Sequence, residues 1–338
     1  MAITKVIIKD FLVFKGEFAP EFCPGVNVLI GGNGTGKTTL LKIIYNSYSL
    51  FRGESLALTS RAYLPYFTCV KKDVSPKIFS DSHGLSWVKD EKLNAFAVYF
   101  SLSEYDYLSP NEKNMRQIAI SASYIPEKDI LEHAKGLLTF IEQKETGFSP
   151  IFKNVLVAAM DVPTREQTSV QKSVGEKIVD IIGGTIAWDE GEGSFYTMRK
   201  DGTHIPFANE ASGFKKLGYL GLLVASGQLR PGTVLFWDEP ENSLNPELIP
   251  MLVEILLELQ RNGVQIFIAT HSEMLSNEFS ISRKNSDEVK FFSLYKDENG
   301  EIKADTDTRF DLLHPNKLTQ ASVEQYEREI ERGLNGSE

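Results

Sequence analysis

The sequence has few of the features that mark membrane, secreted or metal-cluster proteins. Only two cysteines occur among the 338 residues, Cys23 and Cys69, and they show no metal-ligand spacing. No apolar run approaches the roughly 18 residues that span a membrane. The N-terminus begins with strand-like alternation, so we expect no signal peptide. These absences predict a cytoplasmic protein with no membrane contact, in which the cysteines stay reduced and fill buried space.

The sequence also lacks an excess of positive charge. Asp and Glu number 46 against 36 Lys and Arg, a formal net charge of −10. Nonspecific DNA binders usually present a basic face, so this balance argues against direct DNA binding, and a groove gathered by a dimer is the alternative. No long heptad stretch, internal repeat or low-complexity segment occurs, and the five histidines form no recognisable nucleophile triad. Long-armed clamps and triad hydrolases are therefore excluded.

A glycine-rich loop is the most informative feature that is present. Residues 31–38 match the phosphate-binding pattern G-x-x-x-x-G-K-[ST] at every fixed position. An apolar strand at 26–30 precedes the loop and an apolar helix opens at 39–44, so a bound anion would face a helix N-terminus. Lys37 is predicted to reach the β- and γ-phosphates of ATP, and the Thr38 hydroxyl to bind Mg²⁺. The predicted nucleotide-binding residues are Gly31, Gly32, Asn33, Gly34, Thr35, Gly36, Lys37, Thr38 and Thr39.

A second motif lies about 200 residues further along the chain. The apolar strand 234–237 ends in Asp238-Glu239-Pro240, a Walker B pattern with an extra acid. Asp238 is predicted to hold Mg²⁺ through water, and Glu239 to polarise the attacking water as the catalytic acid–base group. Because successive strand residues point opposite ways, adjacent carboxylates can do these two jobs. An acidic turn after a strand is the simpler alternative.

A third motif places a histidine at the tip of another apolar strand. Residues 264–269 form this strand, and His271 follows it. A histidine at a strand end is most often structural. One helix, at 246–260, separates it from the acid pair, and this order predicts that His271 contacts the γ-phosphate and senses its loss.

Together these motifs resemble the ABC class of P-loop ATPases, which includes transporter ATPases, SMC proteins and recombination ATPases. Residues 3–11 and 25–31 look like the start of the SMC/RecF-like branch. Residues 238–246 look like the overcoming-lysogenization-defect (OLD) ATPases and their stand-alone relatives, in which a second acid follows the proline. Residues 124–131 resemble a segment of bacterial AAA family ATPases linked to anti-phage systems. The resemblance implies an α/β fold with a mostly parallel sheet flanked by helices, an antiparallel β portion and an inserted lid or arm.

The resemblance also implies a homodimer in which a signature loop of one subunit caps the ATP bound to the other. The candidate loop, 209–216, keeps only the Ser-Gly of the transporter pattern Leu-Ser-Gly-Gly-Gln. Ser212 and the Gly213 N–H would open a helix at 214–223 and bind a phosphate at its N-terminus. A simple N-cap is the alternative for Ser212. The two lysines that follow either add positive charge in trans or are solvated surface.

Two expected features of this class have no clear match. The glutamine loop that senses Mg²⁺ would follow a strand at 118–125, where Glu127 and Lys128 stand, and either is a possible substitute. An aromatic residue that stacks on adenine is also expected. Phe11 and Phe14 are candidates, and core packing accounts for them equally well.

The organisation along the chain follows from the motifs. We expect one domain over 1–338, in which 51–117 is an inserted lid or arm with a strand at 95–103. The lobe 208–280 carries the signature, the acid pair and His271. Other predicted elements are helices at 129–143, 165–182 and 322–333, and strands at 185–188, 194–199, 204–207, 290–295 and 301–304.

One further acidic pattern invites a nuclease interpretation. Asp305-Thr306-Asp307 fits the metal-binding pair of the nuclease domain that follows the ATPase in OLD proteins. Only about 30 residues follow it here, so we interpret the pattern as an acidic turn after a hairpin strand.

The motifs predict an ATPase, and the resemblance implies that it forms an ATP-sandwich dimer and regulates a separate effector, a nuclease or toxin, in anti-phage defence. The effector and the defence role rest on the resemblance alone. A RecF-like DNA-repair ATPase, a transporter subunit and a non-hydrolysing scaffold are the alternatives. The intact acid pair argues against the scaffold, and the altered signature argues against the transporter.

Overall fold

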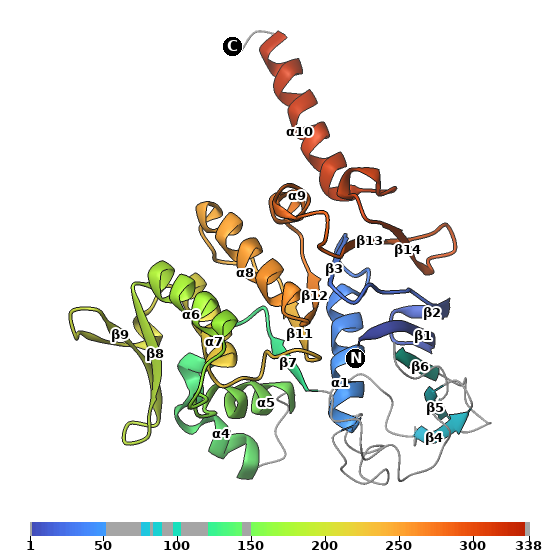
Figure 1. The fold of residues 1–338 in the computed structure, drawn as a ribbon. Coiled ribbons are helices and arrows are strands. Elements are labelled where there is room, and N and C mark those ends of the chain that lie inside the picture. The colour runs from blue at the N-terminus through green and yellow to red at the C-terminus, as the bar shows by residue number, and fades with distance from the viewer. Residues whose placement is uncertain are drawn as a thin grey trace.

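The central element of the fold is a six-stranded sheet (Figure 1). The computed structural model describes residues 2–51, 76–81, 84–89, 97–102, 121–143 and 150–334. The strand order is β14-β13-β3-β12-β11-β7, and every neighbouring pair is parallel except β13 and β14. The strands are β3 (Val26–Gly31), β7 (Ala122–Ile125), β11 (Val234–Asp238), β12 (Gln265–Ala269), β13 (Val289–Lys296) and β14 (Ile302–Asp307). The predicted α/β fold with a mostly parallel sheet is therefore confirmed.

The central strands are buried on both faces because helices cover them, which accounts for their continuous apolar sequences. Every residue of β11 and β12 is buried, and Phe236 stacks on Phe267 with 5.1 Å between ring centroids. In Figure 1, α1 (Lys37–Phe51) lies on one side of β11 and β12, and α8 (Ile249–Arg261) lies on the other. This arrangement fixes the carboxyl ends of β3, β11 and β12, where the three predicted motifs begin.

A smaller antiparallel sheet forms at the N-terminal side. It has the order β2-β1-β6 and consists of β1 (Ile3–Phe11), β2 (Phe14–Phe18) and β6 (Ala97–Leu102). A two-stranded sheet joins β4 (Pro76–Asp81) to β5 (Gly84–Lys89). The predicted lid or arm, 51–117, lies in large part outside the described residues. Its described strand β6 pairs along β1, so this piece belongs to the N-terminal sheet.

A lobe of helices and an antiparallel sheet packs beside β7. Its helices are η2 (Leu131–His133), α4 (Ala134–Gln143), α5 (Pro150–Ala159), α6 (Ser169–Ile182), η3 (Phe207–Asn209) and α7 (Ser212–Ala225), and its strands are β8 (Gly184–Asp189), β9 (Ser194–Arg199) and β10 (His204–Pro206). The helix predicted at 129–143 is present in part, as η2 and α4. The segment starts as a 3₁₀ turn and kinks at Lys135 and Gly136, where Gly136 has a φ of +82°.

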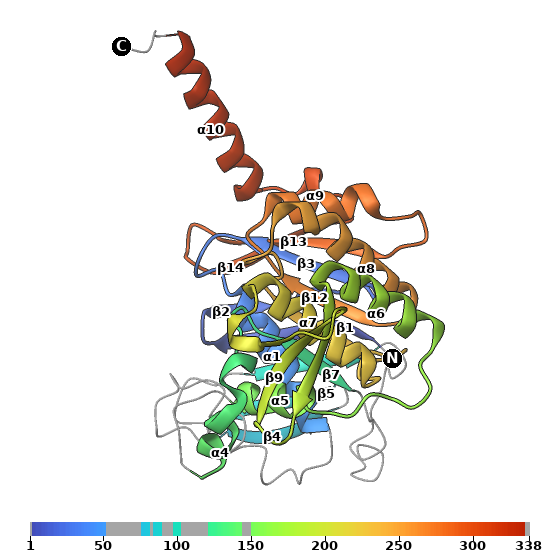
Figure 2. The same cartoon turned by 90° about the vertical axis from the view of Figure 1, so that its left-hand side faces the viewer.

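The C-terminal part ends in a helix that projects from the body. η4 (Pro246–Leu248) precedes α8, α9 (Glu273–Ser282) follows β12, and η5 (Phe310–Leu312) leads to α10 (Lys317–Leu334). Both views show α10 extending away from the rest of the protein (Figures 1 and 2). It begins earlier than the predicted residue 322. The predicted acidic turn at 305–307 is also wrong, because these residues pair with β13 inside β14.

Candidate functional site

The glycine-rich loop connects β3 to α1 and exposes its backbone toward the site. Gly31, Gly34 and Gly36 have φ values of +142°, +73° and +91°, which side chains rarely tolerate. A Cβ at Gly31 would stand 2.3 Å from the carbonyl oxygen of Leu294. Asn33 and Gly34 are exposed, while Thr35 is buried and donates to the Gly32 carbonyl at 2.8 Å. The sequence therefore forms the turned backbone that a phosphate cradle requires.

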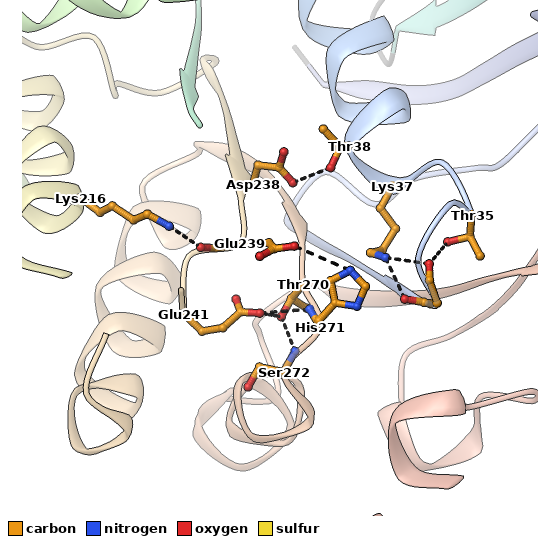
Figure 3. A network of polar contacts seen from close by, with 12 residues as sticks. Thr35, Lys37, Thr38, Lys216, Asp238, Glu239, Glu241, Thr270, His271 and Ser272 are labelled. Atoms are coloured by element: carbon orange, nitrogen blue, oxygen red, sulfur yellow. Dashed lines mark hydrogen bonds and ion pairs between the residues drawn. The ribbon is translucent and has the colours of Figure 1, made fainter. Parts of the chain in front are cut away.

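Lys37 stands at the first turn of α1 and bends back over the loop (Figure 3). Its ammonium donates to the carbonyl oxygens of Gly31 at 2.8 Å and Gly32 at 3.2 Å. Burial lowers the pKa of Lys37 to about 8, against the opposing effect of the carboxylates of Glu239 and Asp238. The cation is thus held within the loop by neutral acceptors, which a phosphate could replace.

Two residues from different motifs meet beside the loop. Thr38 Oγ1 donates to Asp238 Oδ1 at 2.9 Å, although 200 residues separate them (Figure 3). The Tyr124 hydroxyl donates to Asp238 Oδ2 at 3.4 Å. Asp238 is buried, and burial raises the pKa of its carboxyl. Tyr124 belongs to β7, and no pattern in the sequence indicated that it contacts Asp238.

Glu239 lies just beyond β11 in a left-handed backbone conformation. Its φ is +48°, so the strand alternation that predicted opposite directions for the two acids does not apply to it. Its N–H donates to the Ala269 carbonyl at 2.8 Å, which fixes the turn against β12. Burial raises the pKa of the Glu239 carboxyl, and the nearby carboxylates of Glu127 and Glu241 raise it further. Such a carboxyl is better suited to accept a proton than an exposed one.

His271 faces this acid from the end of β12. Its Nε2 lies 3.7 Å from Glu239 Oε1. Burial and the charge of Lys37 lower the pKa of His271, so the imidazole is neutral at pH 7. The contact is therefore that of a neutral imidazole beside a carboxyl group, and the pair borders the glycine-rich loop in Figure 3.

Glu241 connects the two motifs and was given no role by the sequence patterns. Its Oε1 accepts the Thr270 hydroxyl at 2.6 Å and the His271 backbone N–H at 3.0 Å (Figure 3). Thr270 Oγ1 accepts the Ser272 N–H at 2.9 Å. The one feature of the sequence that could have indicated a role for Glu241 is its place as a second acid after the proline.

The structure corrects the prediction that the two lysines of the signature segment are solvated surface. Lys215 and Lys216 are 4% and 6% exposed, so neither is solvated surface. Lys215 forms an ion pair with Glu132. Lys216 donates to the backbone carbonyl of Glu239 at 2.8 Å. Both ammonium groups are therefore engaged within their own chain, and a contribution of either lysine in trans stays a prediction.

Ser212 is exposed and is the first residue of α7, whose N-cap is Ala211. The alternative in which Ser212 is itself the N-cap is therefore wrong. Gly213 packs against the turn that follows the acid pair, where a Cβ would stand 2.6 Å from the Ser243 carbonyl oxygen.

The candidates for the glutamine loop and for adenine stacking have different surroundings in the structure. Glu127 follows β7 and is among the charges that raise the pKa of Asp238, which places it near the site. Lys128 lines a small cavity with Lys216 instead. Phe14 is buried and stacks on Phe18 at 4.7 Å, so it belongs to the core; the side chain of Phe11 lies outside the described part.

The donor set fits a hard divalent cation. A hydroxyl and a carboxylate converge at Thr38 and Asp238, and oxygen donors of this kind suit Mg²⁺ with phosphate and water as its other ligands. Among the described residues no cluster of three or more His, Cys, Asp or Glu side chains forms a self-sufficient metal site. The described helices also include none long and apolar enough to cross a membrane.

Comparison with known proteins decides the family. The model of the family described as "AAA domain, putative AbiEii toxin, Type IV TA system" matches residues 74–277, more than half of the chain. The chain belongs to this family. The match includes the acid pair and His271 and begins after the glycine-rich loop. Motifs, family and fold agree that this family member is an ABC-class P-loop ATPase, as the sequence predicted.

Individual relatives of this AAA-domain protein are distant. The L-cystine import ATP-binding protein TcyN of Bacillus subtilis (strain 168) is 36% identical over 58 residues, 17% of this chain and 20% of that protein. The match thus spans a fifth of that relative's length.

Two solved SMC head structures share the fold. An SmcHead bound to the C-winged helix domain of ScpA is 12% identical with a TM-score of 0.51, covering 95% of this chain and all of that one. An Smc head domain with an extended coiled coil, bound to the C-terminal domain of ScpA derived from Pyrococcus furiosus, is 10% identical with a TM-score of 0.50. It covers 98% of this chain and all of that one.

Proposed function

We propose that the protein binds Mg·ATP at the glycine-rich loop and hydrolyses it. The observation that carries the proposal is the Thr38–Asp238 hydrogen bond, which joins two motifs 200 residues apart, with Glu239 and His271 3.7 Å from each other nearby. Backbone N–H groups of residues 31–38, extended by Thr39, hold the phosphates, and Lys37 neutralises the β- and γ-oxygens. A Mg²⁺ ion held at Thr38 and Asp238 would supply charge stabilisation at the transferred phosphate.

In this proposal, two groups act on the attacking water and the γ-phosphate. Glu239 orients the water and accepts its proton, which its raised pKa favours. His271 is neutral at pH 7 and donates a hydrogen bond from its imidazole to the γ-phosphate, so that its contacts differ before and after hydrolysis.

The proposal includes an ATP-sandwich homodimer. Ser212 is exposed at the start of α7, so its side chain is accessible to a second copy of the chain. A second copy that contributes Ser212 and the Gly213 N–H would place a helix N-terminus against the γ-phosphate. The SMC head fold is consistent with such a pairing.

The proposal also includes a separate effector, with anti-phage defence as its setting. The family description names a putative toxin and a toxin–antitoxin system, which supports action together with a second protein. Helix α10 offers a surface for it, since no α10 residue is buried and Val323, Tyr326 and Ile330 are 49%, 64% and 44% exposed. These three side chains repeat at the spacing of one helix face, and Glu327 and Glu329 flank them. The stripe therefore fits an apolar helix of the effector with basic flanks.

Phosphate release with Mg·ATP tests the hydrolysis, and mass photometry of the same samples tests the dimer. We expect turnover by the wild type, loss of turnover in Lys37→Ala, and loss of both turnover and ATP-dependent dimerisation in Ser212→Ala. A wild type without turnover, with or without added DNA, refutes the hydrolysis; a Ser212→Ala protein that dimerises normally refutes the sandwich. Loss of a copurifying effector in Val323→Glu/Ile330→Glu, with turnover intact, would support the α10 surface.

A further inference from the structure

The segment that follows the acid pair is tied to the segment that carries the histidine by one carboxylate. Glu241 Oε1 accepts two hydrogen bonds, from the Thr270 hydroxyl at 2.6 Å and from the His271 N–H at 3.0 Å. Its other oxygen, Oε2, is buried and has no hydrogen-bond partner among the described residues. All the directional bonding of this carboxylate within the described structure therefore falls on the residues at the tip of β12.

Thr270, the first of these two partners, is itself held in place. The Thr270 N–H donates to the Leu29 carbonyl of β3 at 3.0 Å, and Thr270 is fully buried. Thr270 Oγ1 accepts the Ser272 N–H, and Ser272 Oγ in turn accepts the Leu275 N–H at the start of α9. Glu241 therefore joins a rigid strand end to the helix that follows His271, and the His271 backbone lies between them.

The backbone on the Glu241 side is equally constrained. The Leu244 N–H donates to the Glu241 carbonyl at 3.0 Å, and the Asn242 N–H donates to the Glu239 carbonyl at 3.1 Å. These bonds join residues 239–244 into one hydrogen-bonded turn. The two hydrogen bonds to Glu241 Oε1 therefore add a side-chain link between this turn and the tip of β12, beside the backbone bond from Glu239 to Ala269.

We propose that Glu241 is a positioning residue: its carboxylate holds the His271 backbone so that the imidazole meets Glu239 and the γ-phosphate. This role rests on the proposed ATP hydrolysis. Glu241 touches neither nucleotide nor water in this role; it acts through His271. Glu241→Gln keeps an oxygen acceptor in the place of Oε1, and its NH₂ group takes the place of Oε2, which has no hydrogen-bond partner among the described residues. Glu241→Ala removes both hydrogen bonds.

The test compares Glu241→Gln and Glu241→Ala with Glu247→Ala, which removes an exposed acid from the same connection. Steady-state ATP hydrolysis is measured for each, and backbone amide exchange at His271 is measured without nucleotide. We expect Glu241→Ala to lower kcat roughly 10- to 100-fold, the cost of losing hydrogen bonds to a charged group, with KM for ATP within about 3-fold. Glu241→Gln should retain most of kcat, and Glu247→Ala should match the wild type.

Two further results separate positioning from a general structural role. The double variant Glu241→Ala/His271→Ala should be no slower than His271→Ala, because both changes disable one function. The His271 amide should exchange at least about tenfold faster in Glu241→Ala and stay protected in Glu241→Gln, since only the alanine removes its acceptor. Additive losses in the double variant, or unchanged His271 exchange in Glu241→Ala, overturn the proposal. If the wild type fails to hydrolyse ATP, the proposed function fails, and the exchange measurement still decides the Glu241–His271 link.

Discussion

Replacing Glu239 by glutamine should lower the rate of ATP hydrolysis and raise the stability of the folded protein. The amide matches the carboxylate in size, and the backbone bonds of residue 239, from its N–H to Ala269 and from Lys216 to its carbonyl, do not involve the side chain. The left-handed φ of +48° is also unchanged by the substitution. The variant therefore tests the ionisable group alone.

The expected loss of hydrolysis follows from the role of Glu239 as general base. Positioned proton acceptors contribute roughly 10²- to 10⁴-fold to a rate, so turnover should fall by that factor in Glu239→Gln. ATP binding should persist, because Lys37, Thr38 and the loop backbone are unaffected. An ATP-bound dimer should therefore accumulate.

The expected gain in stability follows from the crowding of carboxylates. Burial and the charges of Glu127, Glu241 and Asp238 raise the pKa of Glu239. An acid whose folded-state pKa is raised destabilises the folded protein once the pH exceeds its unfolded pKa, for which the ordinary value is 4.5. At pH 7 without nucleotide, Glu239→Gln should therefore melt at a higher temperature than the wild type, and this difference should vanish below about pH 4.

Phosphate release, mass photometry and thermal melting at several pH values provide the assay. Glu247→Gln, which neutralises an exposed acid in the same connection, is the matched control and should change neither property. Turnover within about tenfold of the wild type would refute the general-base assignment. A lower melting temperature at pH 7 would refute the electrostatic reasoning.

Three further predictions concern other parts of the protein. Gly218→Ala should destabilise the fold by about 1–2 kcal/mol, because its Cβ would lie 1.6 Å from a side-chain carbon of β8. Gly175 has open space around the position of a Cβ, so Gly175→Ala should stabilise its helix by up to about 1 kcal/mol. Urea unfolding measures both changes. Asp287→Asn should cost about 1–3 kcal/mol at pH 7, since Arg261 bonds both carboxylate oxygens. That cost should disappear as the pH falls through the lowered pKa of Asp287, as acid unfolding curves would reveal. Burial raises the pKa of Cys23 to about 11, so its iodoacetamide labelling at pH 8 should be roughly 100-fold slower than that of an ordinary thiol, measured with the other cysteine replaced by serine.

Local sequence patterns predicted the elements on which the site is built. Continuous apolar runs specified β3, β11 and β12, since strands covered by helices on both faces need apolar residues throughout. The glycines of residues 31–38 specified a loop with positive φ values. The prediction of an acidic turn at 305–307 failed because alternating polar residues also suit an edge strand whose partner, β13, cannot be identified from local pattern.

Only the tertiary structure decided which of these residues meet. The strand order β3-β12-β11-β7 brings Thr38 to Asp238 and places Glu241 against His271, and no periodicity in the sequence encodes the order of parallel strands. The same packing buries Lys216 and directs its ammonium to the Glu239 carbonyl, where sequence alone suggested solvent or a second subunit. The sequence by itself thus determined which functional groups the site contains, because each motif is a short local pattern. The geometry in which that chemistry is arranged depends on contacts between segments up to 200 residues apart, and these exist only once the sheet has formed.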